Sequence, residues 1–193
     1  VRRLSGGGAV YHDHGNLNYT FIVDKDAAPD FNFAVFTLPV IKTLERLGVK
    51  AEFTGRNDLT IDGKKFCGNA QYVRRGRIMH HGCIMLDSNL EVVVNALKVR
   101  EAKFQSKGVK SVRSRVTTIN AHAPRPIAME EFKSLLKGYI LEAEGLEPMA
   151  LTPEQLEEVR RLRDEKYATW EWNYGASRSE EHTSELQSLR HLV

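Results

Sequence analysis

The chain has 193 residues and a formal net charge of +3, with 41% hydrophobic and 27% charged residues. This size and composition are typical of a soluble globular protein with one main domain, with or without a small appendage. No apolar run is long enough to span a bilayer and the given sequence shows no signal-peptide pattern, so we do not expect a membrane protein. The mild charge does not indicate nucleic-acid binding. Two cysteines, Cys67 and Cys83, do not form a disulfide framework, so we expect a cytoplasmic protein.

The first distinctive stretch runs from Arg2 to Asp13 and has the sequence RRLSGGGAVYHD. Its consecutive glycines allow close approach to the backbone, whose N–H groups can form a concave nest for an anion. Arginine adds a planar fork of donors for carboxylate or phosphate. The stretch is therefore either an anion-cradling loop or an ordinary glycine-rich hairpin turn, and its own residues leave both open. It is not a P-loop, because no Lys-Ser or Lys-Thr follows the glycines.

The next residues predict two strands and a helix. Strands are expected over Ala9–His12 and Leu17–Val23, joined by a polar turn. A helix is expected with Pro39 in its first turn; it runs to about Leu47, where Gly48 stops it.

From Val49 the hydrophobic period changes to two, which indicates consecutive antiparallel strands. Asp62-Gly63 is a strong hairpin signal between two of them. A short helix over Leu90–Leu97 follows the last strand. The expected strands are Lys50–Thr54, Asp58–Ile61, Lys64–Tyr72 and Ile78–Leu86.

The segment from Glu101 to Asn120 has no amphipathic period and is rich in basic residues. Its cations are Lys103, Lys107, Lys110, Arg113 and Arg115. A solvated basic loop is the commoner explanation for such a composition. The alternative is a mobile lid that closes over a phosphate group.

Two more helices are predicted near the end of the chain. One spans Met129–Leu141, and the other begins at a capping box on Thr152 and runs to about Tyr167. Alternation over Thr169–Gly175 predicts an extended segment whose tryptophans, Trp170 and Trp172, anchor it to the core. Together these elements predict an α+β fold, a largely antiparallel mixed sheet with flanking helices.

A lysine pair opens the predicted strand Lys64–Tyr72. Alternation places Lys65 and Cys67 on one face and Lys64 and Phe66 on the other. One lysine therefore faces inward, where a lysine needs an anionic partner. A ligand phosphate or carboxylate would supply that partner, and we favour this role for Lys65 over a salt-bridged structural role.

Histidines and cysteines occur nearby but do not suggest a metal site. His80 and His81 are adjacent in a strand and point to opposite faces, so they cannot chelate one ion together. We expect a hydrogen-bonded structural role for at least one of them. Cys67 and Cys83 are expected to behave as small hydrophobic residues, and no metal ligand is assigned.

Six ordered motifs resemble the lipoate–protein ligase A family. They are RRxSGGGAVYHD, GNxN, GRNDL, GKKxxGxA, HHG and SVRSRVT, and the resemblance as a whole covers Arg2 to about Gly175. The resemblance implies the catalytic-domain fold that this family shares with biotin protein ligases (the BPL/LPL fold). It also implies ATP-dependent activation of lipoate to lipoyl-adenylate, with Mg²⁺ accompanying ATP. Transfer to a lysine of a lipoyl domain follows, in an E2 subunit of a 2-oxoacid dehydrogenase or in the glycine cleavage H protein.

The resemblance also implies roles for particular residues. Lys65 corresponds to the catalytic lysine that contacts both the lipoate carboxyl group and the adenylate. Lipoate contacts are expected from Lys65, Gly7, Gly8 and His81. ATP and lipoyl-adenylate contacts are expected from Arg3, Ser5, Gly6, Gly7, Gly8, Ala9, Val10, Tyr11, Asn57, Asp58, Lys65, Ser111, Val112, Arg113, Ser114 and Arg115.

A cysteine-dependent, ATP-independent octanoyl or lipoyl transferase of the same fold is the alternative. It needs a nucleophilic cysteine, which Gly55–Leu59 lacks, and the arginine-rich loop favours ATP. We expect a monomer without nucleic-acid or membrane partners.

We also expect residues 1–177 to be a catalytic domain truncated at its N-terminus, because the motifs start at once and Val1 is not methionine. Residues 178–193 are expected to be a non-native tail translated from a sequencing adapter. A chain truncated in this way is not assured of activity.

Overall fold

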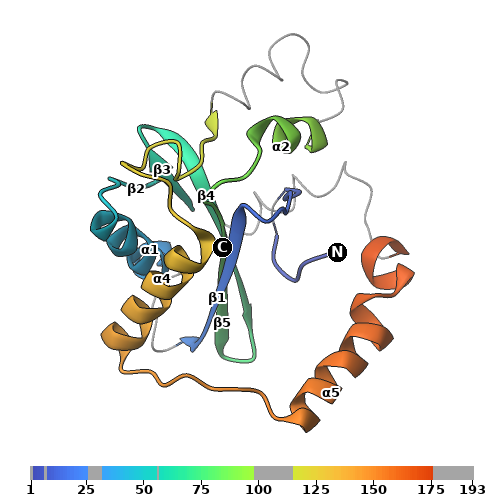
Figure 1. Cartoon of the computed structure of the whole chain (residues 1–193). Helices are drawn as coiled ribbons and strands as arrows, with labels where there is room; N and C mark the ends of the chain where they lie inside the picture. Colours follow the sequence, from blue (N-terminus) through green and yellow to red (C-terminus); the bar gives the residue numbers. More distant parts are fainter. Residues whose placement is uncertain (1, 7, 26–31, 56, 98–114, 176–193) are drawn as a thin grey trace, which may run out of the picture. The chain divides into compact units, whose positions relative to one another are not determined.

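The computed structural model describes residues 2–6, 8–25, 32–55, 57–97 and 115–175 (Figure 1). The described chain forms two compact units. One spans Ser5–Glu147, and the other combines residues 1–4 with the chain from Pro148 onward. Of the predicted lid over Glu101–Asn120, residues 101–114 lie outside the described residues, as does the predicted tail over residues 178–193. The domain limits inferred from the sequence stay a prediction.

The larger unit is built on a five-stranded sheet in the order β1-β5-β4-β3-β2 (Figure 1). All neighbouring strands pair in the antiparallel direction, which confirms the predicted sheet. The hairpin signal Asp62-Gly63 joins β3 to β4, with both residues at positive φ. The strands are β1 (Asn16–Asp24), β2 (Glu52–Thr54), β3 (Asp58–Ile61), β4 (Lys64–Arg74) and β5 (Arg77–Met85).

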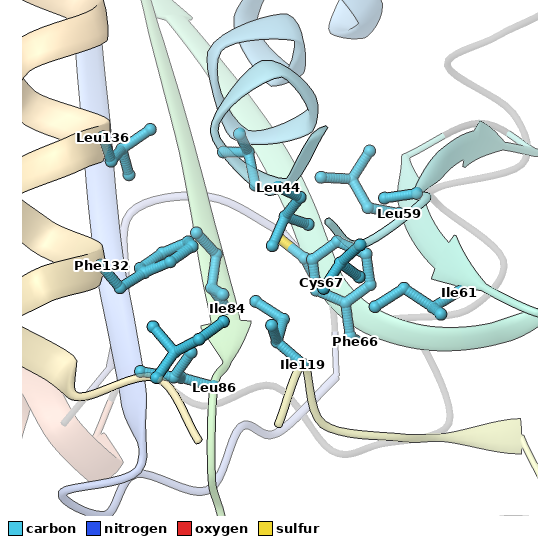
Figure 2. Close-up of a cluster of buried hydrophobic side chains, with 14 residues drawn as sticks. Leu44, Leu59, Ile61, Phe66, Cys67, Ile84, Leu86, Ile119, Phe132 and Leu136 are labelled. Atoms are coloured by element: carbon cyan, nitrogen blue, oxygen red, sulfur yellow. The ribbon is translucent and has the colours of Figure 1, made fainter. Parts of the chain in front are cut away.

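Two helices, α1 (Phe33–Arg46) and α4 (Met129–Glu144), cover the core side of this sheet (Figure 1). Their apolar side chains meet those of the strands in one buried cluster (Figure 2). Leu44 comes from α1, Phe132 from α4, and Ile84 from β5; each is completely buried. Burial of this apolar surface is the main stabilising contribution to the unit.

Helix α1 begins earlier than the sequence predicted. Its N-cap is Asn32, whose side chain accepts a hydrogen bond from the N–H of Ala34, so Pro39 lies inside the helix rather than in its first turn. An interior proline removes one backbone hydrogen bond. The buried face of the helix, which includes Val40 and Leu44, outweighs that cost.

Two further local predictions have different outcomes. The segment Ala9–His12 is irregular rather than a strand, so that prediction is wrong. Its carbonyl at Tyr11 bonds to the side chain of Asn16 instead of a ladder partner. The short helix α2 (Leu90–Ala96) is confirmed, with Asn89 as its side-chain N-cap.

The smaller unit contains α5 (Pro153–Leu162), η4 (Arg163–Tyr167) and η5 (Glu171–Gly175). The predicted capping box is present, since Thr152 and Gln155 exchange side-chain and backbone hydrogen bonds. The predicted extended segment is wrong, because η5 is helical and the Trp170 side chain is 66% exposed. No helix in the described part of the chain combines the length and apolar character needed to cross a membrane.

Candidate functional site

A β-bulge in β4 sets the position of Lys65. Thr60 of β3 pairs with Lys65, whereas the adjacent Leu59 pairs with Cys67, so Phe66 is an extra residue in β4. The strict alternation that the sequence predicted is therefore wrong, because Phe66 and Cys67 are both completely buried. The bulge frees Lys65 from the core side while two consecutive side chains fill the core.

Gly68 gives Lys65 room to lie along the sheet. A Cβ atom at Gly68 would stand 2.8 Å from both Cε and Nζ of Lys65. Any side chain there would push the lysine away, which explains why a glycine follows the lysine pair. The lysine therefore folds back over its own strand instead of extending into solvent.

Asp58 of β3 contacts the same ammonium end of the lysine side chain. Its Oδ1 lies 2.7 Å from Lys65 Nζ, and the two side chains are 36% and 40% exposed. The contact is a close ion pair rather than a well-aligned hydrogen bond. An ammonium group carries three N–H donors, which is more than this contact can use. Lys65 is thus salt-bridged and also accessible to a ligand.

An open cavity of about 420 Å³ surrounds this ion pair. Its far side is formed by Arg115 and Val116, where the chain returns from the basic segment. Val116 pairs with Lys65 in the parallel direction, and the N–H of Thr117 donates to the Lys65 carbonyl at 2.9 Å. The lining includes two cations and one carboxylate, which suits an anionic ligand. The lining residues are Thr54, Asp58, Thr60, Gly63, Lys65, Arg115 and Val116.

The glycine-rich stretch reaches the sheet through Ser5. Ser5 is buried, and its Oγ lies 2.5 Å from Nε2 of His81 on β5. His81 pairs with Ala70, and Cys83 pairs with Gly68. Residues paired directly across antiparallel strands share a face, so Lys65, which lies over Gly68, has the same face as His81. The start of the stretch and the lysine are therefore brought to one face of the sheet.

Asp13 anchors the end of the glycine-rich stretch. Its Oδ1 accepts hydrogen bonds from the N–H of Gly15 and the hydroxyl of Ser88, and its Oδ2 accepts from the N–H of Asn89. These contacts join the stretch to the residues between β5 and α2. Apart from the turn preference of aspartate, no sequence pattern predicts this role.

Asn57, predicted to lie near the nucleotide, makes structural contacts. Its Nδ2 donates to the carbonyl of Asn69, while its own carbonyl accepts from both nitrogens of Asn69. Asn69 is 4% exposed, and its Oδ1 also accepts from the hydroxyl of Tyr19 at 2.5 Å. This buried network fixes the turn before β3, which carries Asp58.

Burial keeps the thiols and one histidine uncharged. Complete burial raises the pKa of the Cys67 thiol far above its usual range. Burial and then the Asp13 carboxylate raise the pKa of Cys83 to about 11. Burial lowers the pKa of His80 to about 4; its ring lies 4.7 Å from that of Phe36 in a stacked pair. A structural role for one histidine of the pair is confirmed.

Not every predicted contact residue is placed at the cavity. Arg3 is half-buried and belongs to the smaller unit. Tyr11 is half-buried, and Gly6, Gly8, Ala9 and Val10 are exposed. Gly7, Ser111, Val112, Arg113 and Ser114 lie outside the described residues.

Sequence reasoning missed several residues that shape the cavity. Thr54 and Thr60 line it and belong to no quoted motif, while Val116 belongs to the motif SVRSRVT but was assigned no contact. Gly63 and Gly68 belong to the motif GKKxxGxA, so the spacing of these glycines around the lysine was an available signal. The lining threonines face each other across β2 and β3, with Thr54 Oγ1 3.4 Å from Thr60 Oγ1.

Comparisons with known proteins agree on one family. The family model for the lipoyl protein ligase A/B catalytic domain matches residues 1–141. The lipoate-protein ligase LplJ of Bacillus subtilis is 48% identical over 180 residues, which cover 92% of this chain and 54% of that protein. The chain thus spans about half the length of the curated relatives it matches.

Solved structures show the same fold. A bi-partite lipoate protein ligase from Thermoplasma acidophilum, described with its E2 lipoyl domain, has a TM-score of 0.77 and 31% identity; the match covers 93% of this chain and 71% of that one. A lipoate-protein ligase A structure with bound ATP has a TM-score of 0.74 and 26% identity. The match covers 91% of this chain and 72% of that one. The structure of a Thermoplasma acidophilum protein with bound lipoic acid has a TM-score of 0.71 and 26% identity. The match covers 91% of this chain and 71% of that one. Biotin protein ligase of Aquifex aeolicus shares the fold alone. Its identity is 16% and its TM-score is 0.50, and the match covers 68% of this chain and 53% of that one.

Proposed function

This chain belongs to the lipoyl protein ligase A/B catalytic domain family, and from that premise we propose that it carries the catalytic site of an ATP-dependent lipoate–protein ligase. The observation that carries the proposal is the setting of Lys65. Asp58 and Gly68 hold its ammonium group in an open cavity that also presents Arg115. Structures of relatives hold ATP or lipoic acid, and these are the substrates we assign here.

The first step joins lipoate to the nucleotide. A carboxylate oxygen of lipoate attacks the α-phosphorus of ATP, a new C–O–P linkage forms, and pyrophosphate leaves with the electron pair of the broken P–O bond. The two reactants are both anions, so a cation between them reduces their repulsion. We assign that role to Lys65, which lines the cavity together with a second cation, Arg115. Donors fixed before the reaction stabilise charge that develops in the transition state.

Mg²⁺ is proposed to enter as the ATP complex, where it neutralises charge on the leaving pyrophosphate. Within the described ranges, no group of three or more His, Cys, Asp or Glu side chains could hold a metal ion. A ligand set supplied mainly by the ATP phosphates is in keeping with how proteins commonly bind Mg²⁺.

The second step transfers the lipoyl group. The uncharged amine of an acceptor lysine attacks the acyl carbon, the bond to the phosphate oxygen breaks, and AMP leaves as an amide forms and the amine loses a proton. Lys65 polarises the acyl oxygen during this step. The Thermoplasma acidophilum ligase is described with an E2 lipoyl domain, which supports a lipoyl domain as acceptor; E2 subunits and the glycine cleavage H protein are the candidates.

We assign the floor of the acyl site to the sheet face beside Lys65. Gly68, Ala70 and Cys83 share that face and are small, while Ser5 brings the glycine-rich stretch over it through His81. Small side chains leave space for an apolar chain and its dithiolane ring. Arg3, Ser5 to Tyr11, Asn57 and the residues 111–115 keep their proposed contacts with lipoate or nucleotide. A monomeric state, a cytoplasmic location and the absence of nucleic-acid partners stay predictions.

The thiols weigh against the transferase alternative. A transferase of that kind acts through a cysteine thiolate, and the sequence contains only Cys67 and Cys83. Burial raises the pKa of both thiols well above neutral pH, so both are protonated in the folded unit. Neither thiol is suited to nucleophilic attack.

Lipoate-dependent exchange of labelled pyrophosphate into ATP tests the proposal. The unmutated chain is expected to catalyse it, and Lys65→Ala is expected to lower the rate by roughly 10²–10³, by analogy with loss of one oxyanion donor. Lys64→Ala is the matched control, because Lys64 is an exposed neighbour that does not line the cavity. Exchange without lipoate, no exchange at all, or a near-normal rate for Lys65→Ala would overturn the proposal.

A further inference from the structure

A chain of side-chain contacts lies next to the cavity but outside its lining. His122 Nε2 lies 2.8 Å from Thr117 Oγ1, and His122 Nδ1 lies 3.0 Å from Asp62 Oδ2. The histidine side chain is 18% exposed, and Thr117 is buried. With a proton on Nδ1 facing the carboxylate, Nε2 accepts from the threonine hydroxyl, so both ring nitrogens have partners; this tautomer is inferred from those partners.

The two ends of this contact chain each adjoin a wall of the cavity. Asp62 immediately precedes Gly63 in the hairpin between β3 and β4, and Thr117 immediately follows Val116. His122 therefore connects two walls that are 53 positions apart in sequence, counting from Gly63 to Val116. A turn fixes the backbone of His122, because the backbone N–H of His122 donates to the carbonyl of Ile119 at 2.9 Å.

Backbone hydrogen bonds hold the described segment that follows Arg115 against the sheet. The N–H groups of Thr117, Ile119 and Asn120 donate to the carbonyls of Lys65, Met85 and Leu86, respectively. Residues 98–114, which precede Arg115, lie outside the described ranges. Thr117 lies two positions after Arg115 in the sequence. Its hydroxyl contacts the side chain of His122.

We propose that His122 is a positioning residue that holds the wall carrying Arg115 and Val116 beside Lys65, through Thr117 on one side and Asp62 on the other. This inference rests on the proposed function and extends it to residues outside the cavity. His122 touches neither Lys65 nor the reacting atoms. Its effect is to fix where the Arg115 wall stands when ATP arrives.

This role predicts a specific kinetic signature. The ammonium group of Lys65 is held independently by Asp58 and Gly68, so the stabilisation of the transition state by Lys65 persists when the wall loosens. Loss of the two His122 contacts is therefore expected to raise the KM for ATP by about tenfold, which corresponds to about one net hydrogen bond. The kcat of pyrophosphate exchange is expected to change by less than about twofold.

Paired substitutions test the role. His122→Phe keeps a ring of similar size but removes both contacts, and Thr117→Val removes only the hydroxyl while the backbone bond to Lys65 stays. Both variants are expected to raise the KM for ATP, and the double variant to raise it no further than the larger single effect. Thr117→Ser keeps the hydroxyl and is expected to restore the unmutated KM.

A matched control and an independent measurement complete the test. Arg125→Gln removes an exposed ion pair with Glu131 near the same turn, and it is expected to leave the KM for ATP unchanged. Amide hydrogen exchange at Thr117 is expected to speed up in His122→Phe and Thr117→Val but not in Arg125→Gln. Two outcomes would overturn this inference alone. One is a KM for ATP in Thr117→Val equal to that of the unmutated chain, and the other is a KM for ATP in Thr117→Ser equal to that of Thr117→Val. Absence of exchange activity in the unmutated chain would instead overturn the proposed function.

Discussion

The two units of the chain are stabilised in different ways. The unit Ser5–Glu147 buries a cluster of apolar side chains between its sheet and two helices (Figure 2). In the smaller unit α5 buries none of its residues, although it carries an apolar row that includes Leu156, Val159 and Leu162. Its order comes from a capping box and from ion pairs along the helix, such as Arg161 with Glu158 and Glu165.

This difference separates tertiary from local causes of structure. Exposed ion pairs between residues three or four apart contribute only a few tenths of a kcal/mol each. Burial of a large apolar side chain contributes about 1.5–3 kcal/mol. Substitutions in the larger unit should therefore change global stability, and those in the smaller unit should change only nearby backbone order.

The largest effect is expected in the shared core. Phe132→Ala removes a completely buried ring that α4 places against the sheet and is expected to lower the free energy of unfolding by about 3–5 kcal/mol. Denaturant titration followed by circular dichroism measures it. Leu156→Ala is the comparison in α5, where the side chain is 40% exposed. Equal losses for the two variants would remove the distinction between the units.

A pH effect is expected next in size. His80 is completely buried, and burial lowers its pKa from 6.5 to about 4. The unfolded chain therefore binds more protons between pH 6.5 and 4, so stability falls as pH falls through this window, by up to about 3 kcal/mol. Denaturant titrations at several pH values measure the slope. His80→Phe is expected to flatten it, and an unchanged slope in that variant would assign the effect to other groups.

A smaller loss is expected at Gly82 of β5. A Cβ atom there would stand 2.4 Å from Asn69 Oδ1 and 2.5 Å from the Tyr19 ring. Gly82→Ala is expected to cost about 1–3 kcal/mol and to break the hydrogen bond between Tyr19 and Asn69. The denaturation midpoint reports the first effect, and the NMR resonances of the Tyr19 ring report the second. A stable variant with that hydrogen bond intact would show that the strands can shift to accept the methyl group.

The smallest effect is expected at the capping box. Thr152→Ala removes the side-chain acceptor for the N–H of Gln155 and is expected to weaken α5 by about 1 kcal/mol. Amide hydrogen exchange should speed up in the first turn of α5, while the denaturation midpoint of the unit Ser5–Glu147 stays the same. Thr152→Ser, which keeps the hydroxyl, should exchange as slowly as the unmutated chain.

Features with local causes could be predicted from the sequence. The strands from Leu17 onward, the hairpin at Asp62-Gly63 and the capping box of α5 depend on neighbouring residues, and the structure confirms them, whereas the predicted strand Ala9–His12 is absent. The bulge at Phe66 depends on how β4 meets β3, so a strict alternation could not reveal it. The start of α1 was missed because the proline outweighed the weaker signal of Asn32.

In the candidate site, too, the residues of a short motif could be predicted, and the contacts between remote residues could not. Lys65 and the glycines around it form a short motif, and both the motif and its resemblance to a family drew attention to them. Arg115 was also expected from that resemblance. The link from Thr117 through His122 to Asp62 joins residues that are remote in sequence, and no local pattern predicts such contacts.

The setting of Lys65 has a consequence for conformational entropy. A long lysine side chain loses up to about 2 kcal/mol of rotamer entropy when it is fixed in one conformation. Here Gly68, which has no side chain, leaves room for the lysine over the strand, and the ion pair with Asp58 restricts it there. Both features exist in the folded protein before any substrate arrives. Much of that loss therefore accompanies folding rather than binding, so an arriving anion meets an ammonium group that is already in place.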